Sequence, residues 1–202
     1  MKILIACEES QVVAAAFRSK GHEAYSCDLL DCSGNHPEWH LKQDVLQLLD
    51  QHWDMIIAFP PCTYMSKAGA RWLYQNGQLN YDRLNKAKAA KEFFMLFYNN
   101  SCKKICIENP VPLNIVGLPK PSQDIQPYYF GHQYSKKTYL WLKGIPPLMA
   151  TNIIIDHKPY LPSNTGYGKR NGLKWSKGFA HNSIIASKTF TGVAAAMADQ
   201  WG

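Results

Sequence analysis

Long apolar runs are absent from this sequence of 202 residues. No stretch reaches the roughly 18–20 apolar residues that a membrane-spanning helix needs, and the longest are the size of a strand. The opening run, residues 1–7, is too short for the apolar core of a secretory signal, and Glu8 and Glu9 follow it directly. We therefore expect a soluble protein of the cytoplasm.

Cysteine patterns typical of a metal site are also absent. The six cysteines, at positions 7, 27, 32, 62, 102 and 106, form no Cys-x-x-Cys pair. Their scatter favours a set of reduced thiols and predicts no metal site.

Acidic residues are few relative to basic ones. The chain has 15 Asp and Glu residues and 22 Lys and Arg residues, which gives a formal net charge of +7. A surplus of this size favours a polyanionic partner such as nucleic acid, although a merely basic protein would also show it. Hydrophobic residues make up 46% of the chain and repeats and low-complexity tracts are missing, so we expect one globular domain over residues 1–202.

Short apolar runs alternate with helical patterns along the chain. The predicted strands cover residues 2–6, 23–28, 41–45, 53–59, 104–107 and 137–142, and the predicted helices cover residues 12–20, 82–99 and 192–201. Ser10 is the expected N-cap of the first helix, and Gly21 is expected to end it. Residues 62–81 are predicted to be a polar loop. This alternation predicts an α/β fold with a doubly wound, mostly parallel sheet.

In such sheets, ligands bind beyond the carboxyl ends of the strands. The residues at these predicted ends are Cys7, Glu8, Glu9, Ser10, Asp28, Asp44, Phe59, Pro60, Pro61, Cys62, Glu108 and Asn109. The fold therefore predicts that acidic residues and one cysteine meet at one edge.

Two of these residues suggest a reaction. A thiolate is the strongest common side-chain nucleophile, and Cys62 is held at the sheet edge by two prolines. Glu108, at the end of a neighbouring strand, could exchange a proton with an electrophile under attack. The structural alternatives are an inert buried thiol for Cys62 and a helix-capping or salt-bridged carboxylate for Glu108.

These residues resemble a known family. The run Pro60-Pro61-Cys62, followed by Ser66-Lys67-Ala68-Gly69, resembles the catalytic motif of the cytosine-C5 DNA methyltransferases, including small phage-type relatives. Glu108-Asn109-Pro110 is similar to the family's Glu-Asn-Val. The resemblance implies a single Rossmann-like, S-adenosylmethionine-dependent methyltransferase domain. It also implies methylation of cytosine at carbon 5 in DNA, with the base extruded from the duplex or presented by a single strand.

The resemblance implies roles for individual residues. Cys62 would be the nucleophile, Glu108 the partner of ring N3, Asn109 a support of the loop, and Pro61 the residue that directs the cysteine. S-adenosylmethionine would meet the residues Cys7, Glu8, Glu9, Ser10, Asp28, Asp44, Phe59 and Pro60. Asp28 corresponds to the ribose ligand and Asp44 to the residue near the adenine. The first loop lacks the family's glycines, and Glu8 or Glu9 either meets the positive end of the cofactor or is exposed to solvent.

Nucleic-acid contacts are expected in two loops and one strand region. The residues are Ser66, Lys67 and Arg71 after the cysteine, Lys136 and Lys137 in place of the family's arginine pair, and Lys169, Arg170 and Trp175 near the C-terminus. The last three lie in residues 146–187, a short basic and aromatic segment where the family carries a large recognition region. An ordinary surface loop is the alternative for both loops.

Two other functions remain open from the sequence. The short recognition segment favours an enzyme of the same scaffold that modifies a nucleotide or another pyrimidine. The glycine-free first loop favours a nucleic-acid-binding protein whose cofactor site has decayed. The joint presence of Cys62 and Glu108 argues for an enzyme.

Overall fold

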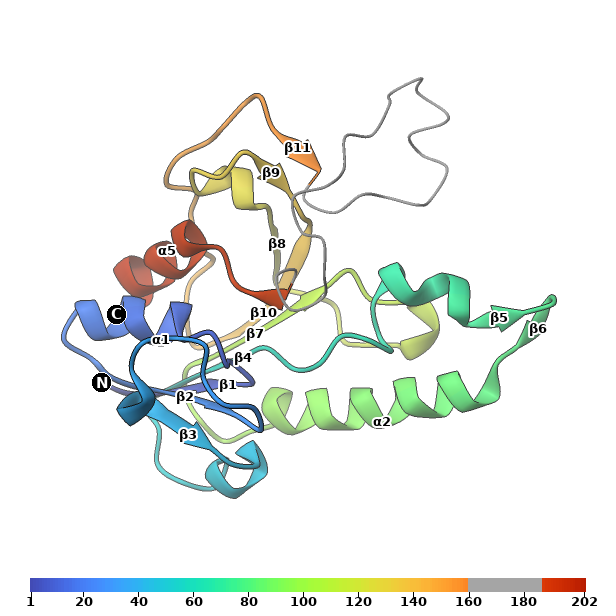
Figure 1. Ribbon diagram of the computed structural model, residues 1–202, viewed down its shortest axis with the longest axis horizontal. Coiled ribbons are helices and arrows are strands. Elements are labelled where there is room, and N and C mark those ends of the chain that lie inside the picture. The colour runs from blue at the N-terminus through green and yellow to red at the C-terminus, as the bar shows by residue number, and fades with distance from the viewer. Residues whose placement is uncertain (160–186) are drawn as a thin grey trace.

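The computed structural model describes residues 1–159 and 187–202. Its centre is a sheet of seven strands (Figure 1). These strands are β1 (Lys2–Ala6), β2 (Glu23–Asp28), β3 (His40–Lys42), β4 (Met55–Ala58), β7 (Ile105–Pro110), β8 (Gln123–Ile125) and β10 (Thr138–Lys143). They lie in the order β3-β2-β1-β4-β7-β10-β8. The first five strands in this order are parallel to one another, and β10 runs antiparallel to both β7 and β8.

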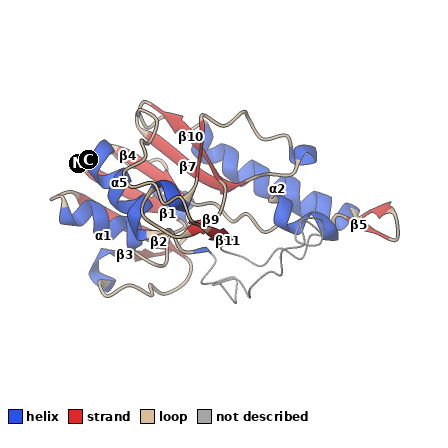
Figure 2. Ribbon diagram, turned by 90° about the horizontal axis from the view of Figure 1, so that it is seen from above, coloured by secondary structure: helices blue, strands red, loops and turns tan. Residues whose placement is uncertain are grey.

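Helices cover both faces of this sheet (Figures 1 and 2). Among the described residues, the α-helices are α1 (Val12–Ser19), α2 (Tyr81–Tyr98) and α5 (Thr191–Trp201). α1 and α5 pack together on one face with Ile3 and Ile57, while α2 packs on the other face with Leu4 and Ile56. Successive residues of a strand point to opposite faces, so strands covered on both sides need unbroken apolar sequences.

The strand order reverses beside β1. The chain passes from β1 to β2 and β3 on one side, and then crosses to β4 on the other. Ala6 and Ala58, the last residues of β1 and β4, are paired in register. A reversal of this kind opens a crevice beyond the carboxyl ends of the two strands.

An arm projects from the body between β4 and α2 (Figures 1 and 2). We define the arm as residues 67–80. It contains the 3-10 helix η3 (Lys67–Trp72) and a hairpin of β5 (Tyr74–Gln75) and β6 (Gln78–Leu79). Asn76 and Gly77 form the hairpin turn with φ of 50° and 78°, the left-handed pair that a two-residue turn of type I′ requires.

The other short elements lie in the connections. They are the 3-10 helices η1 (Pro37–Trp39), η2 (Val45–Leu48), η4 (Asn114–Val116) and η5 (Pro127–Tyr129), and the paired strands β9 (Tyr134–Ser135) and β11 (Lys158–Pro159). None of the helices in the described ranges combines the length and the apolar character needed to traverse a lipid bilayer.

The regular elements largely match the sequence prediction. Both predicted N-terminal strands are confirmed, the long helix is confirmed within one residue, and Gly21 ends α1 with φ of 81°. Several predictions were wrong in detail. The third strand lies at His40–Lys42, the fourth is shorter than predicted, and the loop after Cys62 contains the ordered arm.

Candidate active site

Cys62 lies just beyond the carboxyl end of β4. The amide of Phe59 donates to the carbonyl of Ala6 at 2.9 Å, so the chain follows the sheet for one residue after the strand ends. Pro60 and Pro61 then turn it away from the sheet. Proline has no amide hydrogen and a fixed φ, which stops the strand and leaves few conformations for the cysteine that follows.

Asn109 attaches this turn to the neighbouring strand. Its side chain is fully buried, and Nδ2 donates to the carbonyl of Pro60 at 3.3 Å. On the other side, the amides of Met65 and Ser66 donate to the carbonyl of Cys62 at 3.0 and 2.9 Å. Hydrogen bonds therefore hold the chain on both sides of Cys62, while the role of Asn109 in the reaction stays a prediction.

The sequence analysis predicted that the strand ends before Glu108. In the structure, Glu108 lies within β7. β4 ends beside Ile107, but β7 continues because β10 pairs with Glu108, Asn109 and Pro110. The extra pairing carries Glu108 one residue past the end of β4, to the level of the turn that leads to Cys62. The missed extension comes from an antiparallel partner far along the chain, which a local pattern does not reveal.

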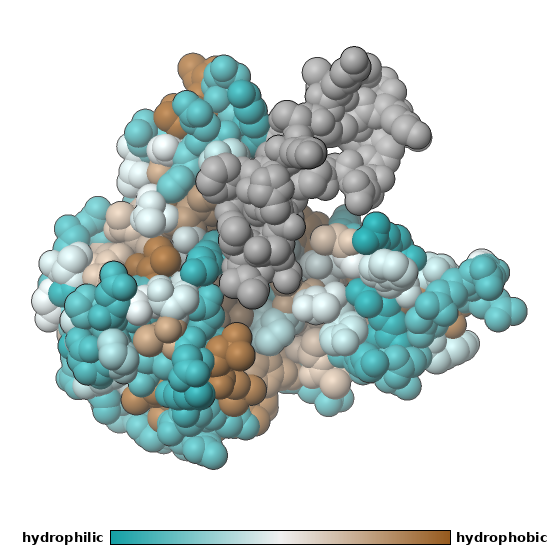
Figure 3. All heavy atoms as spheres, in the orientation of Figure 1, coloured by the Kyte–Doolittle hydropathy of each residue, from teal (hydrophilic) through white to brown (hydrophobic). Residues whose placement is uncertain are grey.

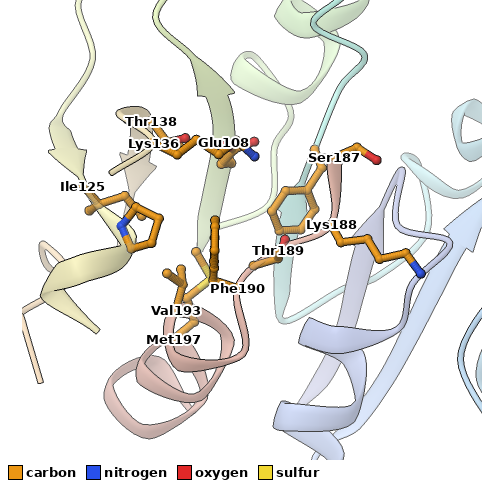
Figure 4. A pocket seen from close by; sticks show the side chains of 12 residues that line it. Glu108, Ile125, Lys136, Thr138, Ser187, Lys188, Thr189, Phe190, Val193 and Met197 are labelled. Carbon is orange, nitrogen blue, oxygen red and sulfur yellow. The ribbon is translucent and has the colours of Figure 1, made fainter. Parts of the chain in front are cut away.

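Glu108 borders a small cavity of about 30 Å³, room for about one water molecule. Lys136 and Thr138 line it beside Glu108, and Phe190 and Met197 line the opposite wall (Figure 4). The segment before α5 adds further polar residues to the lining, and β8 adds the apolar Ile125. The cavity is therefore lined by a mixture of polar and apolar side chains, with a carboxyl and an ammonium group on one side of it.

Electrostatics link Cys62, Glu108 and Lys136. Burial raises the pKa of Glu108, while Lys136 and a hydrogen bond with Thr138 lower it. Burial also raises the pKa of the Cys62 thiol, Glu108 raises it further, and Lys136 opposes both effects. At neutral pH the thiol keeps its proton, and the carboxyl group is shifted toward its protonated form.

The turn after β1 contains no glycine, yet it adopts backbone conformations typical of glycine. Cys7 and Gln11 have φ of 59° and 58°, in the left-handed region. The Gln11 side chain is buried and bonds the main chain of His36 through both its oxygen and its nitrogen. These two bonds help to hold a conformation that non-glycine residues rarely adopt.

Glu8 caps α1, and the predicted N-cap role of Ser10 is wrong. The Glu8 carboxylate accepts hydrogen bonds from the amides of Val13 and Ala14 at 2.7 and 3.2 Å, and the side chain is only 4% exposed. Burial raises its pKa to about 7, although the two helix amides oppose the shift. Ser10 fails as a cap because the chain turns at Gln11 before the helix begins.

Glu9 joins three segments at the same edge. Its carboxylate accepts from the amide of Ser33 at 3.2 Å and lies 3.9 Å from Nζ of Lys188, whose ammonium also donates to Oγ of Ser33 at 2.8 Å. Glu9 is therefore neither fully exposed nor free of charge partners. It connects the loops after β1 and β2 with the segment that precedes α5.

Asp28 and Asp44 form the acidic part of this edge. Asp28 accepts from the amide of Leu30 and Asp44 from that of Leu46, both at 3.0 Å. Both carboxylates raise the pKa of the Cys7 thiol, second to the effect of burial. This places the two acids and Cys7 in one electrostatic neighbourhood. Carboxylates in this arrangement suit a ligand that carries hydroxyl groups and a positive charge.

The residues predicted to contact nucleic acid are in different surroundings. Lys67 and Arg71 are exposed on η3, but the Ser66 side chain is buried. Lys136 lines the cavity, whereas Lys137 forms an ion pair with Asp124 at 3.2 Å. Lys169, Arg170 and Trp175 lie outside the described residues, as does most of the segment 146–187.

Sequence reasoning missed the wall of the cavity that precedes α5. Lys188, Thr189 and Phe190 line the cavity across from Glu108. They follow a stretch without hydrophobic periodicity, so no local pattern singles them out.

A metal site was not predicted, and in residues 1–159 and 187–202 no three His, Cys, Asp or Glu side chains are grouped to hold an ion.

Comparison with known proteins gives limited similarity. No family model matches the chain, and no curated protein matches it. Among solved structures, it is similar to a prophage-encoded Escherichia coli protein described as a DNA modification methyltransferase, with 14% identity and a TM-score of 0.45 over 76% of this chain and 52% of that one. It is also similar to the Entamoeba histolytica methyltransferase EhMeth, with 14% sequence identity and a TM-score of 0.45. That match covers 81% of this chain and 60% of EhMeth. The chain spans little more than half the length of these proteins, and similarity at this level does not establish a shared activity.

Proposed function

We propose that this protein transfers a methyl group from S-adenosylmethionine to carbon 5 of cytosine in DNA. The observation that carries the proposal is the pairing of Cys62 with Glu108 at the carboxyl ends of adjacent central strands. Glu108 raises the pKa of the Cys62 thiol there, and Lys136 lowers the pKa of both groups. The sequence resemblance at residues 60–69 and 108–110 assigns cytosine as the base.

The chemistry of cytosine explains why both groups are needed. Carbon 5 is a poor nucleophile until another group adds to carbon 6. Addition of the Cys62 sulfur there removes the aromaticity of the ring and moves electron density to carbon 5. A proton held by Glu108 at ring N3 stabilises the charge that develops. After methylation, water takes the carbon 5 proton, the Cys62 thiolate leaves carbon 6, and the N3 proton returns to Glu108, which restores the aromatic ring.

The raised pKa values define what each group contributes. A neutral Glu108 carboxyl can donate to N3, which an ionised one cannot. The Cys62 thiol must lose its proton before attack, and Lys136 favours the thiolate because its positive charge opposes the effects of burial and of Glu108. Lys136 has the opposite consequence for Glu108, because it lowers the pKa of that carboxyl group and so opposes the effect of burial that keeps the proton there.

The acidic edge fits the proposed cofactor. Asp28 would bind the ribose hydroxyls, Asp44 would lie toward the adenine, and Glu9 would face the positive end of the molecule. When bound, S-adenosylmethionine would supply an electrophilic methyl group. Cys7 and the Phe59–Pro60 turn would form the walls, since these residues follow β1 and β4 at the reversal of strand order.

The test is transfer of label from S-adenosylmethionine carrying a radioactive methyl group. We expect label in cytosine-containing DNA and none in DNA in which 5-methylcytosine replaces every cytosine. Label in free deoxycytidine nucleotides, with none in DNA, would support the same-scaffold alternative. Absence of label in both substrates, together with absence of cofactor binding by calorimetry, would refute the proposed reaction.

A further inference from the structure

The tip of the arm presents exposed side chains. Trp72 and Tyr74 are 51% and 55% exposed, and Gln75, Asn76 and Gln78 are exposed as well. In both ribbon views the hairpin lies at the far end of the molecule, away from the sheet (Figures 1 and 2). The space-filling view shows mainly hydrophilic residues there (Figure 3).

The arm is nevertheless firmly built at its base. The Leu73 side chain is buried in the core cluster beneath α2, and its carbonyl accepts from the amide of Asn80 at 2.8 Å. The Asn80 side chain then caps α2 by accepting from the amide of Arg83 at 3.0 Å. A two-stranded hairpin is marginal by itself, so these contacts fix how the tip projects.

Basic residues outnumber acidic ones in the arm and in the helix that follows it. Residues 64–92 contain six Lys and Arg against two Asp and Glu. Arg71 lies over the Trp72 ring at 4.7 Å, which holds its guanidinium at the surface beside the hairpin. The exposed tip carries no charge of its own: its side chains are amides and aromatic rings. The arm therefore has an uncharged tip that can form hydrogen bonds, and positively charged residues where it joins the body.

We propose that the arm is a β-ribbon that enters a groove of duplex DNA. A two-stranded ribbon fits the major groove, where amide side chains pair with base edges, while cations at its base bind phosphates. Gln75 and Gln78, paired across the hairpin, would contact the bases, and Lys67 and Arg71 the backbone. A single strand is a poorer match, because it binds in concave basic grooves and the arm is a projection. The inference rests on the proposed function for DNA as the substrate, and adds the duplex form and the residues that read it.

The test compares two matched double variants in a binding assay without cofactor. Duplexes of about 24 base pairs are first enriched from a randomised pool by the unmodified protein. We expect Gln75→Ala with Gln78→Ala to lower affinity for the enriched duplexes about tenfold or more, and to leave affinity for the starting pool nearly unchanged. The control, Gln47→Ala with Gln51→Ala, removes two exposed glutamines near η2 and should retain full affinity.

Fluorescence anisotropy of labelled DNA gives both affinities. Equal affinity of the two double variants for the enriched duplexes would overturn the inference, as would tighter binding of the unmodified protein to the matching single strands. The binding assay does not depend on methyl transfer. It therefore decides the role of the arm even if the protein transfers no methyl group.

Discussion

At the scale of single residues, the site combines a thiol that keeps its proton at neutral pH with a carboxyl group that burial shifts toward its protonated form. Burial raises the pKa of both Cys62 and Glu108, and Lys136 lowers both. The productive form has a thiolate and a neutral carboxyl, so it is a minor state of the pair. The two protons belong to a coupled system, and a pH profile reports on the pair as a whole.

We predict a bell-shaped dependence of the methylation rate on pH. Below the lower apparent pKa both groups are protonated, and above the higher one both are ionised, so the rate falls on each side. Glu108→Gln should lower the rate by about a hundredfold or more and change the shape of the profile. Glutamine cannot ionise, so the rate should rise with pH to a plateau with no alkaline fall. A bell-shaped pH dependence that is unchanged in the variant would contradict the assignment of Glu108 as the proton donor.

Glu8 gives a prediction for stability. Its pKa is about 7 in the folded protein and 4.5 when the side chain is fully exposed to water, so folding favours the protonated form. That contribution is complete below pH 4.5 and is lost as pH rises through 7, about 3 kcal/mol in all. Glu8→Gln should remove this part of the pH dependence, measured as free energy of unfolding in urea from pH 4 to 8. The exposed Glu92→Gln is the control, and equal pH slopes for the two variants would refute the buried cap.

At the scale of elements, α2 positions the loop that follows Cys62. Arg83 in its first turn donates from Nη2 to the carbonyl of Thr63 at 2.9 Å and lies over the Tyr64 ring at 5.2 Å. Gly69 passes so close that a Cβ there would collide with the guanidinium group. The loop, the arm and α2 therefore form one packed unit around a single arginine.

We predict that Arg83→Met slows methylation by about tenfold or more through misplacement of Cys62. The affinity for S-adenosylmethionine should stay unchanged, because Arg83 is remote in the fold from Asp28 and Asp44. Arg83→Lys should fail to restore the rate, since lysine lacks the planar fork. Lys88→Met, on the exposed face of the same helix, is the control. An Arg83→Met rate equal to that of the control would show that Arg83 does not position the loop.

The elements that local sequence determines were predictable. β1, β2 and α2 carry continuous apolar or helical patterns, and Gly21 marks a helix end by its φ. Elements that depend on distant partners were not predictable. β8 is three residues long and exists because β10 pairs with it, and the extension of β7 to Pro110 has the same cause. The arm was missed although Asn76-Gly77 is a strong turn signal, because its strands have only two residues each.

The candidate site was predictable in part for a related reason. The carboxyl ends of parallel strands meet at one edge, and this brings Cys62 near Glu108, and Asp28 near Asp44. Side-chain direction was not available from the strand pattern. Glu8 turns toward α1, Ser66 is buried and Lys137 pairs with Asp124, all through contacts made in the folded chain.

At the scale of the whole molecule, charge is distributed unevenly. The chain carries +7, and the stretch from residue 64 to 92 alone has six cations against two anions. We predict that the logarithm of the DNA affinity falls linearly with the logarithm of salt concentration. Lys67→Gln and Arg71→Gln should each reduce the slope by about one, whereas Lys20→Gln, on the α5 side, should leave it unchanged. Binding that is insensitive to salt would refute phosphate contact by the arm.

The central claim is that Cys62 attacks the base, and covalent trapping tests it most directly. Duplex DNA with 5-fluorocytosine in place of cytosine should form an adduct in the presence of S-adenosylmethionine, because fluorine at carbon 5 cannot leave as a cation. We expect a denaturation-resistant complex with the unmodified protein, mapped to Cys62 by peptide mass spectrometry, and none with Cys62→Ser. An adduct that persists in Cys62→Ser, or that maps to Cys7 or Cys32, would contradict the account.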